Sequence, residues 1–279
     1  MASARLVKTF AALAVTLVAA GCGSSARHDD LRGITSVLVA RHGKLVEEHY
    51  YGGTRATDRL PVFSITKSVT SALVGIAIAE GRLKLDERLP WRRQVTLRQL
   101  LSMTAGYAPA FEFQHIDAQT LAARALVNRP GTFSYDSGSY DLLADMLERA
   151  TGVPIAAYAR RRLFGPLGIP GVRWPGGRGA SGLLLRPRDL LAFGELYLHG
   201  GKGIVPAGWV RTSTRLQTRI RRGLGYGYGW WIRPHSFAGY GYLDQILAVY
   251  PQRDEVVVVT ASREDARARA IVRRIAGGE

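Results

Sequence analysis

Apolar side chains recur at helical spacing most clearly in residues 64–80. Ile65, Val69, Leu73 and Ile76 follow one another at intervals of three or four residues, and Gly81 comes just beyond them as a stop signal. The far side of this segment is also built of small or apolar residues. The pattern therefore predicts a helix that is buried on nearly all sides.

Strand-like runs lie near the two ends of the chain, whereas the middle has a helical pattern. Residues 34–39 and 44–51 are rich in Val, Leu and Tyr and are separated by His42-Gly43, a pair suited to a tight turn. Between about residues 96 and 218, short helical patterns alternate with Gly- and Pro-rich loops. Three more strand-like runs follow, at residues 225–233, 242–250 and 255–261.

These two groups of strands can form one antiparallel sheet only if the helical middle is inserted between them. A final helix would place Ala268, Ile271 and Val272 against that sheet. We therefore expect an α+β fold for residues 34–279. Its antiparallel sheet of about five strands would be flanked by helices, with a helical lobe inserted at about residues 96–218.

The N-terminal residues have the composition of an export signal. Arg5 and Lys8 precede an apolar run at residues 10–20, which is too short to span a bilayer. The chain's single cysteine, Cys22, follows Val-Ala-Ala-Gly, so residues 1–21 resemble a lipoprotein signal peptide and Cys22 is the predicted lipidation site. The alternative is an ordinary signal peptide that happens to contain a cysteine. A lipidated chain would use residues 22–33 as a tether to the cell membrane, facing the outside or the periplasm.

The chain is strongly basic, with 38 Lys and Arg against 22 Asp and Glu and a formal charge of +16. No nucleic-acid recognition module is visible, and an exported protein rarely meets nucleic acid, so we expect no nucleic-acid partner. Anionic lipids or wall polymers are the better-fitting partners. The alternative is a compositional bias, because 33 of the 38 cations are arginine, as expected of a GC-rich genome.

Ser64 and Lys67 stand three residues apart at the start of the predicted buried helix. This spacing is just under one helical turn, so the hydroxyl and the amine project from the same side. A serine hydroxyl needs an adjacent base to act as a nucleophile, and a lysine in an apolar environment can be that base where an arginine cannot. Ser64 is thus the candidate nucleophile and Lys67 the candidate base. A lysine that merely snorkels out of a buried helix is the alternative.

Residues 63–68 (Phe-Ser-Ile-Thr-Lys-Ser) and the small-residue helix after them resemble the serine β-lactamase-related family. That family includes class C β-lactamases, D-alanyl-D-alanine carboxypeptidases and related esterases. Residues 81–86, 95–106 and 182–190 resemble later segments of the family in the same order. The resemblance covers about residues 34–262 and implies a β-lactamase/transpeptidase-like fold and hydrolysis through an acyl-enzyme.

Tyr135 and Ser137 match the second motif of this family, a tyrosine followed two residues later by an asparagine. The resemblance implies that Tyr135 relays a proton between the nucleophile and the leaving group. A packing role for this tyrosine is the alternative. Ser137 takes the place of the asparagine as a substrate-binding residue, which resembles the esterase and nylon-oligomer-hydrolase branch more than true β-lactamases.

Gly239-Tyr240-Gly241 is the best match for the third motif, which usually has a basic residue on a strand lining the site. The resemblance makes Gly239, Tyr240 and Gly241 substrate-binding residues, whose glycines would let a substrate lie close to the strand. Because no basic residue stands here, an anchor for a substrate carboxylate is missing and ester substrates are favoured. The aromatic run at residues 225–231 could line a substrate groove or pack in the core.

The sequence therefore predicts a serine hydrolase of esterase, D,D-peptidase-like or β-lactamase-like type, acting on esters or amides. We expect no metal and no cofactor, because the six histidines are scattered and no metal or nucleotide motif occurs. The expected partners are a small-molecule or peptidoglycan-like substrate and the membrane, reached through the N-terminal lipid. A catalytically silent relative that binds cell-wall fragments or a partner protein is the alternative, since the second and third motifs are altered.

Overall fold

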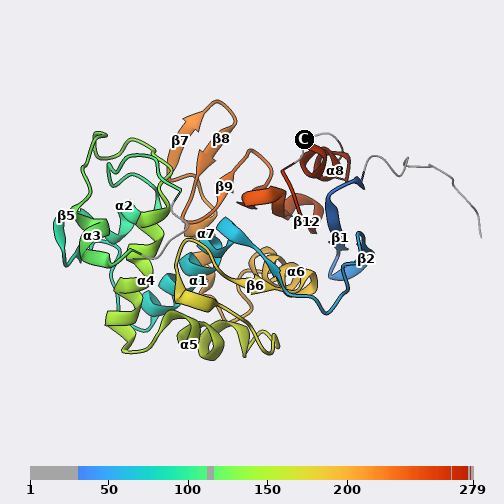
Figure 1. The fold of residues 1–279 in the computed structure, drawn as a ribbon, viewed down its shortest axis with the longest axis horizontal. Coiled ribbons are helices and arrows are strands. Elements are labelled where there is room, and N and C mark those ends of the chain that lie inside the picture. The colour runs from blue at the N-terminus through green and yellow to red at the C-terminus, as the bar shows by residue number, and fades with distance from the viewer. Residues whose placement is uncertain (1–30, 112–115, 265, 276, 278–279) are drawn as a thin grey trace, which may run out of the picture.

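One large antiparallel sheet, flanked by helices, organises the molecule (Figure 1). The computed structural model describes residues 31–111, 116–264, 266–275 and 277, so the predicted signal peptide, Cys22 and most of the predicted tether lie outside the described residues. The strands of the sheet run in the order β2-β1-β12-β11-β10-β9-β8-β7. They are β1 (Ile34–Arg41), β2 (Lys44–Tyr50), β7 (Thr218–Arg221), β8 (Leu224–Tyr226), β9 (Trp231–Ile232), β10 (Phe237–Gly241), β11 (Gln245–Tyr250) and β12 (Glu255–Ala261).

The sheet confirms the predicted fold class, but its eight strands exceed the predicted number of about five. The run at residues 225–233 is two strands, because the chain turns at Gly229, which has a φ of +82°. β7 was missed because its Thr-Arg-Ile-Arg sequence is polar. The two glycines of β10 weaken its strand pattern, so this strand was indicated only by the resemblance to the third motif.

The central strands bury both of their faces. In β12, Val256 and Val258 belong to one core cluster, whereas Val257 and Val259 belong to another on the opposite face. Side chains alternate between the faces of a strand, so the unbroken valine run of this strand reflects cover on both sides.

Helices provide that cover. The helix α6 (Pro187–Leu198) packs on one face of β1, β11 and β12, and α8 (Ala266–Ile275) packs on the other face of β11 and β12. Ala268, Ile271 and Val272 of α8 are buried against the sheet, as the sequence predicts. The inserted middle of the chain is thus not a separate lobe throughout, because α6 belongs to the sheet layer.

The helix α1 (Thr66–Ala79) lies in the interior of the molecule (Figure 1). It packs against α4 (Ser137–Thr151), and α2 (Leu97–Leu101), α3 (Ala118–Ala123) and α5 (Ile155–Ala159) gather around α4. Residues 66–77 of α1 are all buried, which confirms the prediction of a helix enclosed on nearly all sides. No helix among the described residues has both the length and the apolar character needed to cross a bilayer. The other elements are η2 (Phe63–Ile65), η3 (Arg160–Phe164), η4 (Pro175–Gly177), α7 (Ala207–Ser213), η5 (Tyr242–Asp244) and η6 (Pro251–Arg253), with the paired short strands β3 (Leu60–Pro61) and β6 (Leu184–Leu185), and β4 (Arg88–Leu89) and β5 (Arg92–Thr96).

Gly75 shows how tightly α1 is enclosed. A Cβ atom at this position would overlap the indole ring of Trp209 on α7, so only glycine permits the observed approach of the two helices. We expect Gly75→Ala to lower the free energy of unfolding by about 1–2 kcal/mol, because the cost of overpacking exceeds the gain of about 1 kcal/mol in helix propensity.

Denaturant unfolding measures the free energies of unfolding of Gly75→Ala and of the control variant Gly208→Ala against that of the natural chain. Gly208, in α7, has only the flexible end of Arg211 near its virtual Cβ, at 3.9 Å, so alanine there should leave stability unchanged or slightly higher. Equal effects of the two substitutions would contradict this account of the packing.

Candidate active site

Ser64 and Lys67 meet at the start of the buried helix. Ser64 lies in η2, and Lys67 lies one turn further on, in the first turn of α1. The Nζ atom of Lys67 donates a hydrogen bond to the Oγ atom of Ser64 over 3.0 Å. Only 1% of the Lys67 side chain is exposed. The amine therefore does not snorkel to solvent but points at the predicted nucleophile.

Two further oxygens surround the amine of Lys67. Its Nζ atom donates to the Oγ atom of Ser137, at 3.3 Å, and to the main-chain oxygen of Ala180, at 3.1 Å. Ser137 is the first residue of α4, and Ala180 lies in the loop between η4 and β6. Ser137 was predicted from the second motif, whereas no sequence signal indicated the carbonyl of Ala180.

Tyr135 lies beside the pair, as the second motif predicts. The Nζ atom of Lys67 is 5.1 Å from the centroid of the Tyr135 ring. Phe111 and Trp231 stack on this ring, with centroids 5.5 and 5.6 Å away. Among the described residues, no hydrogen bond joins the Tyr135 hydroxyl to either Ser64 or Lys67. Its position is within the site, and its role as a proton relay stays a prediction.

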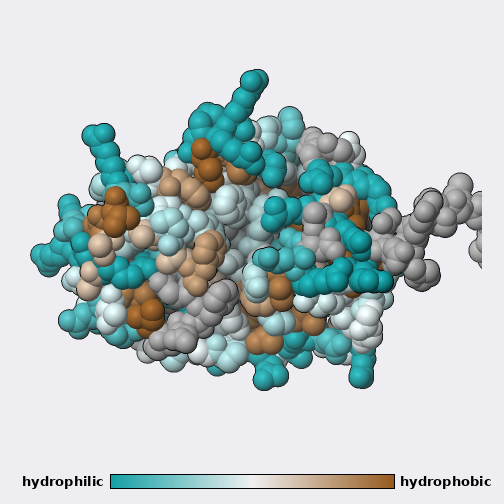
Figure 2. Space-filling view, turned by 45° about the horizontal axis from the view of Figure 1, so that its top comes forward, coloured by the Kyte–Doolittle hydropathy of each residue, from teal (hydrophilic) through white to brown (hydrophobic). Residues whose placement is uncertain are grey.

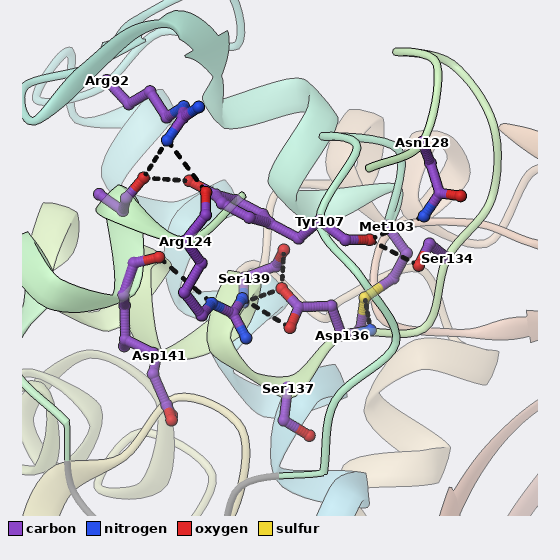
Figure 3. A network of polar contacts seen from close by, with 12 residues as sticks. Arg92, Met103, Tyr107, Arg124, Asn128, Ser134, Asp136, Ser137, Ser139 and Asp141 are labelled. Atoms are coloured by element: carbon purple, nitrogen blue, oxygen red, sulfur yellow. Dashed lines mark hydrogen bonds and ion pairs between the residues drawn. The ribbon is translucent and has the colours of Figure 1, made fainter. Parts of the chain in front are cut away.

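Asp136 fixes the loop that presents Tyr135 and Ser137 (Figure 3). Its carboxylate accepts hydrogen bonds from the main-chain N–H and the hydroxyl of Ser139, at 2.8 and 2.7 Å, and so caps α4. The other carboxylate oxygen accepts from Arg124 Nη2 at 2.7 Å. Since Asp136 is only 1% exposed, this arrangement leaves the two neighbouring residues little freedom. The Asp-x-x-Ser spacing is a cap signal that sequence reasoning missed.

A second buried carboxylate, that of Asp141, fixes the loop of Ala180. Its Oδ2 atom accepts from Arg178 Nε and Nη2, at 3.1 and 2.6 Å, and its Oδ1 atom accepts from the N–H of Ala180 at 2.9 Å. The hydroxyl of Thr70 on α1 donates to the carbonyl of Gly179 at 2.8 Å. The carbonyl that contacts Lys67 is thereby tied to both α4 and α1.

The charges near the Ser64–Lys67 pair are balanced. The carboxylates of Asp136 and Asp141 each form an ion pair with an arginine. Burial raises the pKa of Tyr226, which contacts Tyr135, well above that of a free tyrosine, so this phenol stays neutral. Within the described ranges, no group of three or more His, Cys, Asp or Glu side chains could hold a metal ion.

Ser64 opens into a pocket of about 540 Å³. Most of its lining residues are aromatic or small, and one, Glu264, is charged. The lining residues are Phe63, Ser64, Phe111, Tyr135, Ser137, Ala180, Ser181, Trp231, Tyr240, Gly241, Tyr242 and Glu264. A concave pocket with one nucleophile and few polar groups is the usual form of a small-molecule site.

The residues of the third motif divide between this pocket and the core. Tyr240 and Gly241 line the pocket, but Gly239 does not. A Cβ atom at Gly239 would contact Ser68 Oγ at 3.1 Å and Ile65 Cγ2 at 3.2 Å, so this glycine lets β10 approach α1 closely. Gly239 thus has a packing role, and its contact with the substrate stays a prediction.

The aromatic run at residues 225–231 divides in the same way. Tyr226, Tyr228 and Trp230 are buried in the core, whereas Trp231 lines the pocket and stacks on Tyr135. Trp231 thus fits the interpretation of the run as a groove lining, and the three buried residues fit its interpretation as core packing. Sequence reasoning missed Phe63, Phe111, Tyr242 and Glu264 as pocket residues.

Comparison with known proteins agrees with this geometry. The model of the Beta-lactamase family matches residues 26–277. A D-aminopeptidase of Brucella anthropi is 28% identical over 161 residues, which cover 48% of this chain and 31% of that protein. The chain thus spans about a third of the length of this curated relative.

Solved structures share the fold at lower sequence identity. A Bacillus anthracis protein assigned as a 6-aminohexanoate-dimer hydrolase superposes with a TM-score of 0.78 at 20% identity, covering 89% of this chain and 79% of that one. A D-stereospecific amidohydrolase from Streptomyces superposes with a TM-score of 0.74 at 18% identity, covering 88% and 94%. Since the family model extends over nearly all of the residues that build the sheet, the helices and the Ser64 pocket, this chain belongs to the beta-lactamase family.

Proposed function

We propose that this chain hydrolyses esters or amides through an acyl-enzyme formed on Ser64. The observation that carries the proposal is the 3.0 Å contact between Lys67 Nζ and the Oγ atom of Ser64, a residue that lines a pocket of about 540 Å³. A nucleophile within hydrogen-bond reach of a buried base is the arrangement that covalent catalysis requires. The named relatives, a D-aminopeptidase and an amidohydrolase, support hydrolysis of amides.

The contacts of Lys67 suit a base. To accept a proton, the amine must enter the cycle with its lone pair free, and it then has two N–H donors and one acceptor. The oxygens of Ser137 and Ala180 receive the two donors, and the hydroxyl of Ser64 can turn its own proton toward the lone pair. The amine would take this proton as the oxygen of Ser64 attacks the substrate carbonyl.

The start of a helix supplies part of the charge stabilisation for this attack. Ser64 lies in η2, the turn that leads into α1, and the N–H groups of Ile65 and Thr66 in this turn donate to the carbonyls of Val62 and Phe63, so the chain runs directly into the positive end of the helix dipole. N–H groups at this place favour the negative charge that develops on the carbonyl oxygen. Tyr135 would then pass a proton to the leaving group, and water would release the acyl group.

The lining of the pocket indicates which substrates fit. Aromatic rings of Phe111, Tyr135 and Trp231 offer apolar walls, and no lining side chain is basic. A substrate carboxylate, such as that of a penicillin, would find no cation there. The exposed carboxylate of Glu264 would instead repel it and attract a substrate ammonium group. We therefore propose neutral or amine-bearing substrates.

We also propose that the chain is lipid-anchored through Cys22 and faces the outside of the cell membrane or the periplasm. Support comes from the apolar run at residues 10–20 and from the cysteine that follows it. Cells grown with labelled palmitate should incorporate label into the natural chain and not into Cys22→Ala. Label in the Cys22→Ala chain would contradict the anchor.

Removing either member of the Ser64–Lys67 pair should abolish turnover. With p-nitrophenyl butyrate we expect Ser64→Ala and Lys67→Arg each to lower kcat/KM by about a thousand-fold or more, because one removes the nucleophile and the other replaces the base by a cation that keeps its proton. Lys84→Arg, at an exposed lysine, is the matched control and should leave kcat/KM unchanged. Activity of Ser64→Ala equal to that of the natural chain would contradict the assignment, and a natural chain with no activity would favour the silent alternative.

Asp141 should act as a positioning residue, because it holds the loop whose carbonyl contacts Lys67. We expect Asp141→Asn to lower the free energy of unfolding by about 3 kcal/mol, since it removes a hydrogen-bonded charge partner of the buried Arg178 guanidinium. In the folded variant kcat should fall by about ten-fold with little change in KM, because Asp141 does not line the pocket.

Asp86→Asn is the control for this substitution. Asp86 forms an exposed ion pair with Arg98, so its loss should cost less than about 1 kcal/mol and leave kcat unchanged. An Asp141→Asn variant with normal kcat would refute the positioning role while leaving the structural role intact.

Glu264 should favour substrates with an ammonium group. Comparing p-nitrophenyl 6-aminohexanoate with p-nitrophenyl hexanoate, we expect Glu264→Gln to lower the preference for the amino ester by about five-fold, the effect of one exposed charge. Glu87→Gln, at a carboxylate outside this pocket, should leave the preference unchanged. An unaltered ratio of the two kcat/KM values in Glu264→Gln would remove Glu264 from substrate recognition.

A further inference from the structure

A second hollow, of about 320 Å³, lies between the sheet and α8, and the proposed reaction does not use it. Its floor is apolar and consists of Ala238 from β10, Ile246 and Ala248 from β11, and Val272 from α8. Tyr240 lines both this hollow and the pocket of Ser64. The two cavities are therefore neighbours that share one aromatic ring.

Basic side chains surround this hollow, which we name the basic groove. Arg233 and His235 come from the loop between β9 and β10, and Arg269 and Arg273 come from α8. No acidic residue lines the groove, in contrast with the Ser64 pocket, where Glu264 is the one charged lining residue. The two neighbouring cavities thus carry opposite charge.

Most of these basic side chains form no ion pair with any described acidic residue. Arg233, His235 and Arg273 are exposed and form no ion pair within the described part of the chain. Arg269 lies over the ring of Tyr240, at 5.9 Å from its centroid, and its Nε atom is 3.6 Å from Asp244 Oδ1. The two guanidinium groups of Arg233 and Arg273, beside one apolar floor, are thus available to attract an external anion.

The groove lies at the end of the molecule where the described chain begins. The N–H of Ser262, just before α8, donates to the carbonyl of Gly33, just before β1, at 2.8 Å. Four arginines stand within residues 267–274 of α8. Figure 2 shows hydrophilic side chains crowded over this end of the molecule. A tether at residues 22–33 would therefore enter the domain beside the most basic helix.

We propose that the basic groove binds the phosphate of an anionic phospholipid headgroup and so docks the α8 face on the membrane. A guanidinium can donate two parallel hydrogen bonds to one phosphate, and Arg233 and Arg273 approach the groove from different elements. The apolar floor suits the glycerol and the first carbons of an acyl chain. A lipid fits better than a free phosphate because the groove combines this floor with its cations.

The test uses the chain from residue 23 onward, which contains every element of the described fold and no acylated cysteine. It should co-sediment with vesicles of phosphatidylglycerol and phosphatidylcholine and not with phosphatidylcholine alone. Arg233→Gln combined with Arg273→Gln should lower the partition coefficient by about thirty-fold, since each arginine near an anionic surface contributes about five-fold.

Arg160→Gln combined with Arg161→Gln is the matched control. These exposed arginines lie in η3, outside the groove, and their loss changes the net charge by the same amount. The control pair should bind within about two-fold of the parent, and thermal unfolding should show both pairs to be folded. If the two double variants lost vesicle binding equally, binding would depend on net charge alone and not on the groove, which would overturn the proposal.

The source of the phosphate is distinguished by a second measurement. Glycerol 3-phosphate and inorganic phosphate are titrated into the same proteins, with backbone amide signals of residues 233–240 and 269–273 as the readout. Vesicle binding that requires Arg233 and Arg273 supports the membrane. Saturable binding of the free phosphates without any vesicle binding would make the groove a site for a soluble phosphate and overturn the lipid proposal. Binding of neither would overturn both.

Discussion

The burial of one amine-bearing side chain is the constraint on which the rest of the site depends. Removing an amine from water is costly unless oxygens replace its hydration. Lys67 meets this condition through Ser64, Ser137 and Ala180, which come from three separate parts of the chain. The nucleophile is thus one of the groups that satisfy the buried base, so the same contacts that stabilise the fold bring the reactive atoms together.

The fold meets this constraint by enclosing α1 and fixing each of its neighbours. Gly239 lets β10 approach the start of α1, and Gly229, with its left-handed backbone, lets the β8–β9 turn lie against Lys67 and Ser71. On the opposite side, the buried carboxylates of Asp136 and Asp141 pair with Arg124 and Arg178 and hold the segments that carry the second motif and the carbonyl of Ala180. Packing and paired charges therefore set the positions that the chemistry needs.

Local patterns predicted those parts of the molecule that are specified over one or two turns of chain. The spacing of Ser64 and Lys67 and the buried face of α1 follow from helical geometry alone. Short strands were harder, because β7 is polar and β10 is rich in glycine. The packing role of Gly239 was not foreseen for a related reason: a glycine pattern shows that another group approaches closely but not whether that group is a ligand or a helix.

Contacts between distant residues could not be predicted in this way. Asp141 and the N–H of Ala180 are 39 residues apart, and Glu264 reaches the pocket of Ser64 from the far end of the chain. Such pairs depend on how the sheet and helices pack, which no window of sequence contains. The composition does not predict the charge of the pocket either. The chain has a net charge of +16, but no basic residue lines the pocket of Ser64.

The central claim is that Ser64 is an activated nucleophile, and covalent labelling tests it most directly. A fluorophosphonate should add one adduct to the intact protein, and peptide mapping should place that adduct on Ser64. The account predicts that labelling is slowed strongly in Lys67→Arg, because the hydroxyl then lacks its base. An adduct on any other residue, or an unchanged labelling rate in Lys67→Arg, would contradict it.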